Sequence, residues 1–257
     1  MNTRAQPRPA RPANDPRVPR RRPVSAQRAA GRRRLRVLIV VGTVGVLVAA
    51  AWAVSVSPLL DIDHLEVRGV HHLTAAQVEH AGDVHPGDAM AWLDPGKVTS
   101  RIEAMPYVRT ASVAREWPDT VRITVHERRP AAWVDSPGGK ALVDGTGRVL
   151  ELVLAPPAGL PQLLGTRVVP PVGATITPAD GARVAAGLAG LDAGRTTSVE
   201  VTDHGVVLHL GTGPEIRMGD ANRIAVKVRA ALAVLGASTD TVVNYVDVSV
   251  PTNPVAG

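Results

Sequence analysis

The 257-residue chain contains no cysteine and no phenylalanine, and its only aromatic residues are four Trp and two Tyr. The lack of cysteine excludes disulfide frameworks, thiolate metal sites and cysteine nucleophiles. With so few aromatic side chains, any core must be built from Val, Leu, Ile and Ala. A hydrophobic content of 45% is nevertheless ordinary for a chain that buries a core. The composition therefore predicts a folded protein without redox chemistry.

Acidic residues are almost absent from the N-terminal segment. Residues 1–36 hold twelve Arg and a single acidic residue, Asp15, whereas residues 37–257 hold 17 basic and 22 acidic residues. The formal charge of +6 thus comes from the tail. Pro, Ala and Arg offer too little apolar surface to offset the entropy of ordering, so we predict that residues 1–36 are disordered. Without interleaved aromatic residues, we expect this tail to attract inner-membrane lipid and not nucleic acid.

An uncharged run of twenty residues, 37–56, follows the basic tail. As a helix it spans about 30 Å, the thickness of a bilayer's hydrocarbon core. We therefore predict a transmembrane helix over residues 37–57. Because Arg residues precede it and the next ionisable residue is Asp61, the positive-inside rule places the N-terminus in the cytoplasm. A cleaved signal peptide is the alternative, although its apolar core usually has only about 7–15 residues.

Residues 59–129 have the pattern strand, helix, helix, strand, strand. A capping box at Thr74–Gln77 starts the first helix, and Asp94-Pro95 starts the second. Alternating side chains predict strands at 65–70, 108–115 and 121–127. We predict that both helices pack on one side of a three-stranded sheet. Its edges would then be free to pair with another chain.

Residues 130–253 are predicted to form a mainly antiparallel β domain with two helices, so the fold class is α+β. The strands are predicted at 142–150 (two strands around an Asp-Gly turn), 198–202, 206–210, 215–218 and 241–250. The helices are predicted from 177 and at 222–235. Residues 254–257 are taken as a C-terminal tail. If the final strand lies at a sheet edge, it could accept a strand from a partner.

Several motifs in these two domains resemble one known family. They are Val67-Arg68-Gly69, Pro86-Gly87-Asp88, Met105-Pro106-Tyr107-Val108, and the run from Glu116-Trp117-Pro118-Asp119-Thr120-Val121 to Glu127-Arg128-Arg129-Pro130-Ala131-Ala132-Trp133. With the layout of tail, anchor and two outer domains, they resemble the FtsQ/DivIB cell-division family, whose first outer domain is a POTRA domain. The resemblance implies a non-enzymatic, single-pass protein of the bacterial cytoplasmic membrane, enriched at the septum. The implied partners are the FtsB–FtsL coiled coil and other divisome membrane proteins.

The resemblance also implies that partners bind the final strand and the residues just after it. By motif position these residues are Tyr245, Asp247, Ser249, Val250, Thr252 and Asn253. The family often has a basic and then an aromatic residue where this chain has Ser249 and Val250. On the preceding helix, Arg223 and Lys227 could contact an acidic partner helix, although solvated charges on a helix face are the commoner explanation.

Known catalytic and metal-binding motifs are missing from the sequence. It contains no H-E-x-x-H, G-x-S-x-G, P-loop or G-x-G-x-x-G pattern. His71, His72, His80 and His85, with Asp83 nearby, lack the spacing of metal ligands. We therefore expect no metal, no cofactor and no enzymatic activity, which disfavours a membrane-anchored cell-wall enzyme.

A transport-associated POTRA protein that binds unfolded or extended polypeptide is the second hypothesis. Such proteins usually continue into an outer-membrane barrel, and the residues after 129 supply too few strands for one.

Overall fold

The computed structural model describes residues 25–55, 60–191, 195–211, 213–237 and 243–257. The chain divides into two compact units, Met1–Ser55 and Val56–Gly257. The fold class is α+β, as predicted. The membrane anchor and the two sheets therefore belong to separate units, and each unit is described by itself.

The first unit contains one long helix, α1 (Ser25–Ser55). Its segment Arg36–Ala53 is long and apolar enough to cross a bilayer. The helix begins at Ser25. Our prediction of disorder is therefore wrong for residues 25–36. Ala and Arg favour helix, and they extend a helix that the apolar segment already nucleates. The predicted disorder of residues 1–24 lies outside the described residues.

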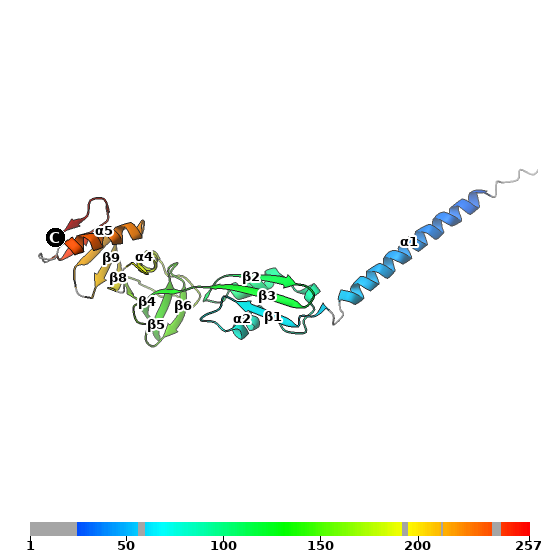
Figure 1. The fold of residues 1–257 in the computed structure, drawn as a ribbon, viewed down its shortest axis with the longest axis horizontal. Coiled ribbons are helices and arrows are strands. Elements are labelled where there is room, and N and C mark those ends of the chain that lie inside the picture. Colours follow the sequence, from blue (N-terminus) through cyan, green and yellow to red (C-terminus); the bar gives the residue numbers. More distant parts are fainter. Residues whose placement is uncertain (1–24, 56–59, 192–194, 212, 238–242) are drawn as a thin grey trace, which may run out of the picture. The chain divides into compact units, whose positions relative to one another are not determined.

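The first part of the second unit is a three-stranded sheet with two helices and one short 3-10 turn. Its elements are β1 (His64–Arg68), α2 (Ala75–Gly82), η2 (Met90–Trp92), α3 (Pro95–Glu103), β2 (Val108–Glu116) and β3 (Thr120–Glu127). The strand order is β1-β3-β2, with β1 parallel and β2 antiparallel to β3. The predicted order of strand, helix, helix, strand, strand is confirmed (Figure 1).

Local sequence signals explain why these elements form. The capping box that begins at Thr74 is present, and the Asp94 carboxylate accepts hydrogen bonds from the first turn of α3. On β3, alternate side chains are fully buried, and they pack against buried side chains of α2 and α3 in one cluster. The members of this cluster from β3, α2 and α3 are Val121, Ile123, Val125, Val78, Val98 and Ile102. Both helices therefore cover the same face of the sheet.

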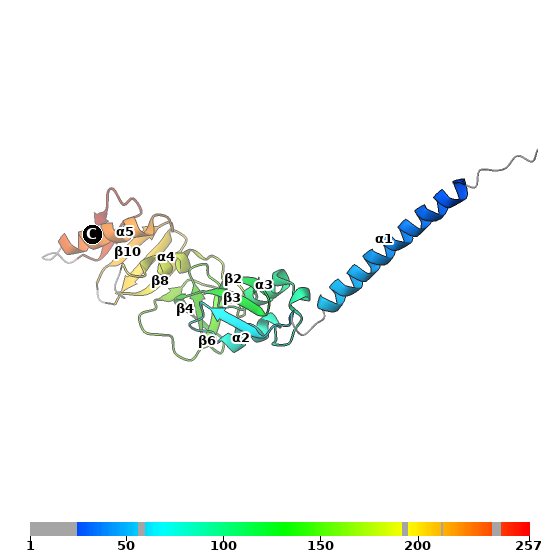
Figure 2. The same ribbon diagram turned by 45° about the vertical axis from the view of Figure 1, so that its right-hand side comes forward.

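The second part of the unit is a nine-stranded sheet with two helices. Its elements are β4 (Pro130–Ser136), β5 (Gly139–Asp144), β6 (Val149–Val153), β7 (Gln162–Leu164), α4 (Asp180–Leu188), β8 (Thr196–Thr202), β9 (Gly205–Leu210), β10 (Glu215–Gly219), α5 (Ile224–Ala237), β11 (Tyr245–Asp247) and β12 (Val255–Ala256). The strand order is β12-β11-β10-β9-β8-β7-β4-β5-β6. Figure 2 labels β10, β8, β4 and β6 of this sheet. Buried residues of α4, α5 and the strands form one continuous aliphatic core.

The two sheets are joined by a two-residue connection and by polar contacts beside it. The Arg128 guanidinium donates to the Asp144 carboxylate at 2.7 Å and to the Val108 carbonyl at 3.0 Å. Nearby, the Tyr107 hydroxyl donates to Glu151 at 2.6 Å, and burial with this bond raises the pKa of Tyr107. The Arg128–Asp144 ion pair is largely shielded from water, with side-chain exposures of 16% and 7%. These contacts hold the three-stranded sheet in its orientation against the nine-stranded sheet.

We expect Asp144→Ala to lower the free energy of unfolding by about 3 kcal/mol, because it leaves the shielded Arg128 guanidinium without its counter-charge. Urea unfolding of the full chain in detergent measures this. As a control, Arg183→Ala removes an exposed ion pair with Asp180 and should cost at most about 1 kcal/mol. Equal losses in the two variants would contradict the special role of the shielded pair.

The same carboxylate gives a pH dependence. Burial alone would raise the pKa of Asp144, but hydrogen bonds from Thr146, Arg128 and Arg148 outweigh it and hold the pKa below its usual value. The stabilisation is therefore complete above the unfolded-state pKa and lost as the pH falls through the folded-state pKa. The difference in unfolding free energy between the wild type and Asp144→Asn should shrink below about pH 4. A difference that stays constant over that range would refute this assignment.

Candidate partner-binding edge

The predicted final strand is not at an edge of the sheet. Regular pairing with β10 ends at Asp247, and β12 occupies the other side of β11. Tyr245 N–H donates to the Gly257 carbonyl at 3.0 Å, and Gly257 N–H donates to the Tyr245 carbonyl at 3.2 Å. Residues 254–257, predicted to be a tail, thus include the last strand. Of the predicted strand 241–250, residues 241–242 lie outside the described residues.

The chain reverses because a turn interrupts the predicted strand. Pro251 is buried and has no N–H, so it cannot continue a ladder. Asn253 N–H donates to the Val250 carbonyl at 3.0 Å and closes the turn. The following residues then run back along β11. The edge at this end of the sheet is therefore β12, two residues long, and β6 is the terminal strand at the other end.

The register of β12 determines what it offers to a partner. Tyr245 and Gly257 exchange both of their hydrogen bonds, so the neighbouring pair, Val246 and Ala256, is the non-hydrogen-bonded kind. The N–H and C=O of Ala256 consequently point away from β11. Pro254, two residues earlier, has the same orientation but no N–H. The open edge thus presents the Ala256 N–H as its donor.

Six of the eight residues predicted to bind a partner lie together in this terminal segment. Tyr245 and Asp247 are half-buried in β11, whereas the other four are exposed in the loop that leads to β12. These four are Ser249, Val250, Thr252 and Asn253. The Asp247 carboxylate accepts from the Ser249 hydroxyl at 2.6 Å and from its N–H at 2.9 Å, and these bonds lower the pKa of Asp247. The loop is therefore held against the strand.

Arg217 is a feature of this surface that the sequence reasoning missed. Its guanidinium carbon lies 4.2 Å from the centroid of the Tyr245 ring, and its carbonyl accepts from Val248 N–H at 2.9 Å. A basic and an aromatic side chain therefore stand together beside the edge. The alternation of β10 could have shown that Arg217 points outward, but its neighbour is set by the parallel pairing of β10 with β11.

Lys227 is not on the partner surface that we predicted for it. Its side chain is only 2% exposed, and its ammonium group donates to the Met218 carbonyl at 2.8 Å and to the Asp220 carbonyl and carboxylate. The side-chain hydrogen bond from Lys227 lowers the pKa of Asp220 to about 2. Lys227 lies on the inner side of α5, next to the buried Val228, so it ties the helix to the end of β10. Arg223, which precedes α5, is exposed.

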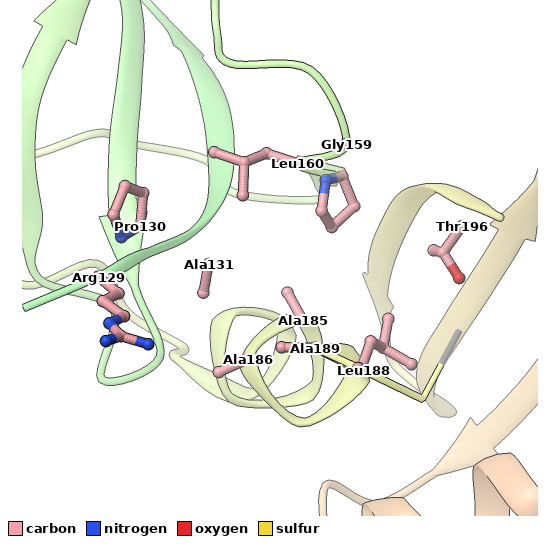
Figure 3. Close-up of a pocket in the computed structure, with 12 residues that line it drawn as sticks. Arg129, Pro130, Ala131, Gly159, Leu160, Ala185, Ala186, Leu188, Ala189 and Thr196 are labelled. Carbon is pink, nitrogen blue, oxygen red and sulfur yellow. The ribbon is translucent and has the colours of Figure 1, made fainter. Parts of the chain in front are cut away.

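A hollow of about 350 Å³ lies between the end of α4 and the loop before β7 (Figure 3). Its walls are mainly Ala, Gly, Pro and Leu, with Ala185 and Ala186 contributed by α4. Of the described residues that line it, Arg129 alone is charged. With no carboxylate or imidazole beside the guanidinium, the hollow lacks an acid–base pair and is suited to an apolar side chain.

The histidines considered as metal ligands have other surroundings. His72 stacks on Tyr107 with ring centroids 3.8 Å apart, and His85 lies 3.8 Å from the Asp88 carboxylate. In the part of the chain that the structure describes, no group of three or more His, Asp or Glu side chains is arranged to hold a metal ion. The surface with the clearest binding features is therefore the β12 edge with its loop.

Fold and surface define a membrane-anchored POTRA protein with an open sheet edge. The family model of the FtsQ-type POTRA domain matches residues 60–128. The cell division protein FtsQ of Streptomyces collinus is 30% identical over 241 residues, which cover 89% of this chain and 90% of the relative. FtsQ of Corynebacterium glutamicum is 27% identical over 212 residues, which cover 77% and 90% of the two chains.

The chain belongs to the FtsQ family of cell division proteins. The residues that the structure describes contain one apolar helix long enough to cross a bilayer, and with its relatives this makes the chain a single-pass membrane protein with a role in the divisome at the septum. The predicted family is thereby confirmed, and the hypothesis of a transport-associated POTRA protein is not supported by these relatives.

The buried position of Lys227 gives a test of its structural role. We expect Lys227→Met to lower the free energy of unfolding by about 2–3 kcal/mol, because two carbonyls and one carboxylate lose their shared donor. Arg229→Ala, on the same helix but exposed, should change it by less than about 0.5 kcal/mol. Urea unfolding of the full chain in detergent distinguishes the two. An unchanged stability of Lys227→Met would show that the lysine is not holding β10.

Proposed function

We propose that the protein is a non-enzymatic divisome scaffold that binds FtsB–FtsL-type coiled-coil partners at the β12 edge. Through these partners it couples early division proteins to septal peptidoglycan synthesis. Membership of the FtsQ family supports the divisome role. The observation that carries the binding mode is the outward orientation of the Ala256 N–H and C=O on an edge strand.

The partner adds a short strand to β12. Main-chain hydrogen bonds to Ala256 supply affinity, and side chains around the edge select the sequence. Val250 and Val255 are exposed next to this edge and offer apolar contacts. The remaining predicted contact residues, Tyr245, Asp247, Ser249, Thr252 and Asn253, belong to the same surface.

Basic side chains near this surface lie beside acidic ones. Arg217 stands over the Tyr245 ring, and Arg223 is exposed before α5. Glu215 and Asp247 lie on the two paired strands β10 and β11. An acidic residue of the partner would pair with one of these guanidinium groups, a contact that weakens at high salt. Lys227, being buried, has no part in this contact.

The orientation in the membrane follows from charge. The basic segment before residue 37 stays in the cytoplasm and contacts anionic lipid, and the two sheets lie outside. Other divisome membrane proteins have access to α1 within the bilayer, where its apolar side chains are exposed.

We expect Ala256→Pro to weaken partner binding about tenfold, because it removes one outward donor worth about 1.4 kcal/mol. Binding of the full chain in nanodiscs to an FtsB–FtsL-type pair, measured by biolayer interferometry, tests this. Ala256→Val is the matched control, since it keeps the N–H and should bind like the wild type.

The outcomes separate two binding modes. If removal of residues 255–257 strengthens binding, the partner displaces β12 instead of adding to it, and strand addition at β12 is wrong. If neither Ala256→Pro nor this truncation changes the affinity, the edge is not the binding site.

A further inference from the structure

The four tryptophans of the chain have very different surroundings. Trp133 is held in place: its indole N–H donates to the Leu160 carbonyl at 3.1 Å, and the Lys140 ammonium lies 3.9 Å from its ring centroid. Trp92 and Trp117, in contrast, are 67% and 55% exposed. Within the described ranges, neither of these two indole N–H groups has a hydrogen-bond partner. An exposed indole offers a large apolar ring together with an N–H that is free to bond to another molecule.

Both exposed tryptophans flank the residues at which the chain enters the POTRA domain. Asp61 forms a β-bridge with Ala89, and the Ala89 carbonyl accepts a hydrogen bond from the backbone N–H of Trp92 at 3.0 Å. On the other side of this entry segment, the backbone N–H of Asp63 donates to the carbonyl of Asp119 at 2.9 Å. Asp119 follows Trp117 by two residues. The turn between β2 and β3 lies at the end of the sheet where β1 begins (Figure 1). The two indoles are therefore on segments that border residues 61–63.

The sequence places this entry next to the membrane. Six residue steps separate Ser55, the end of α1, from Asp61, and a chain of that length reaches at most about 20 Å in any conformation. Trp52 lies three residues before Ser55. Trp92 and Trp117 thus lie on segments that border the residues through which the POTRA domain is connected to the anchor.

The chemistry of the surface favours the uncharged layer of the bilayer interface. Indoles partition to the membrane–water boundary, where the ring meets acyl chains and the N–H reaches lipid ester oxygens. The charged residues that share a hollow with Trp92 are of both signs, with Asp83, Asp88 and Asp94 beside Lys97 and Arg101, so they give no net attraction to anionic headgroups. The attraction therefore comes from the indoles and not from charge.

We propose that Trp92 and Trp117 dock the POTRA domain onto the lipid ester layer of the membrane that holds its anchor. This contact does not depend on the β12 edge or on any partner.

Shallow lipid quenching of tryptophan fluorescence tests this on the full chain. The protein is placed in phosphatidylcholine nanodiscs, with or without lipid brominated near the top of its acyl chains. Trp52→Phe removes the indole of the anchor, and adding Trp92→Phe and Trp117→Phe leaves Trp133 as the baseline. The emission difference between these two variants is the signal of Trp92 and Trp117. We expect brominated lipid to cause a loss of this signal while the baseline is unchanged.

A matched control tests the location. Leu154, just after β6, is 93% exposed, so Leu154→Trp in the baseline variant adds an exposed indole outside the POTRA domain. Its emission should not be quenched. Equal quenching of this control, or an unquenched signal from Trp92 and Trp117, would overturn the proposal; in the second case a protein partner becomes the occupant. Because no division partner is present, the result is independent of binding at β12.

Discussion

Arg128 is one of only two residues between the strand that ends the small sheet and the strand that begins the large one. Its guanidinium is shielded from water and paired with Asp144, which also accepts three hydrogen bonds from its own turn. A charge in this position is stable only while its partner stays in place. The arrangement of the two sheets therefore depends on this ion pair, with Tyr107 and Glu151 as a second link beside it.

The large sheet ends in a way that suits a protein with specific partners. A long exposed edge invites aggregation, and short strands and proline limit it. Here the edge strand has two residues, and Pro254 precedes it without an N–H to offer. The reversal of the chain at Pro251 thus replaces a longer edge by a short one. If a partner pairs with this edge, as we propose, its selection falls to nearby side chains such as Arg217 and Val250, since two residues offer few main-chain hydrogen bonds.

The distribution of aromatic residues relates the two units to their surroundings. With no phenylalanine, both cores are aliphatic, and tryptophan is free for other roles. Trp133 packs beside β7, while Trp92 and Trp117 remain on the surface near the entry from the anchor. The exposed tryptophans and the edge at β12 are the surfaces that we propose for contacts to lipid and to a partner strand.

Local patterns in the sequence determined the anchor, the capping box at Thr74, the alternating strand β3 and the family motifs, because each depends on residues close together along the chain. Tertiary structure alone decided which strand forms the edge. It buried Lys227 against β10 and set Arg217 beside Tyr245. Helical spacing already placed Lys227 on the face of Ile224 and Ala231, but it did not show which groups would accept hydrogen bonds from its ammonium, and alternation gave no sign of the contact between Arg217 and Tyr245. Strand order and burial depend on pairing between distant segments, and a one-dimensional pattern does not contain that pairing.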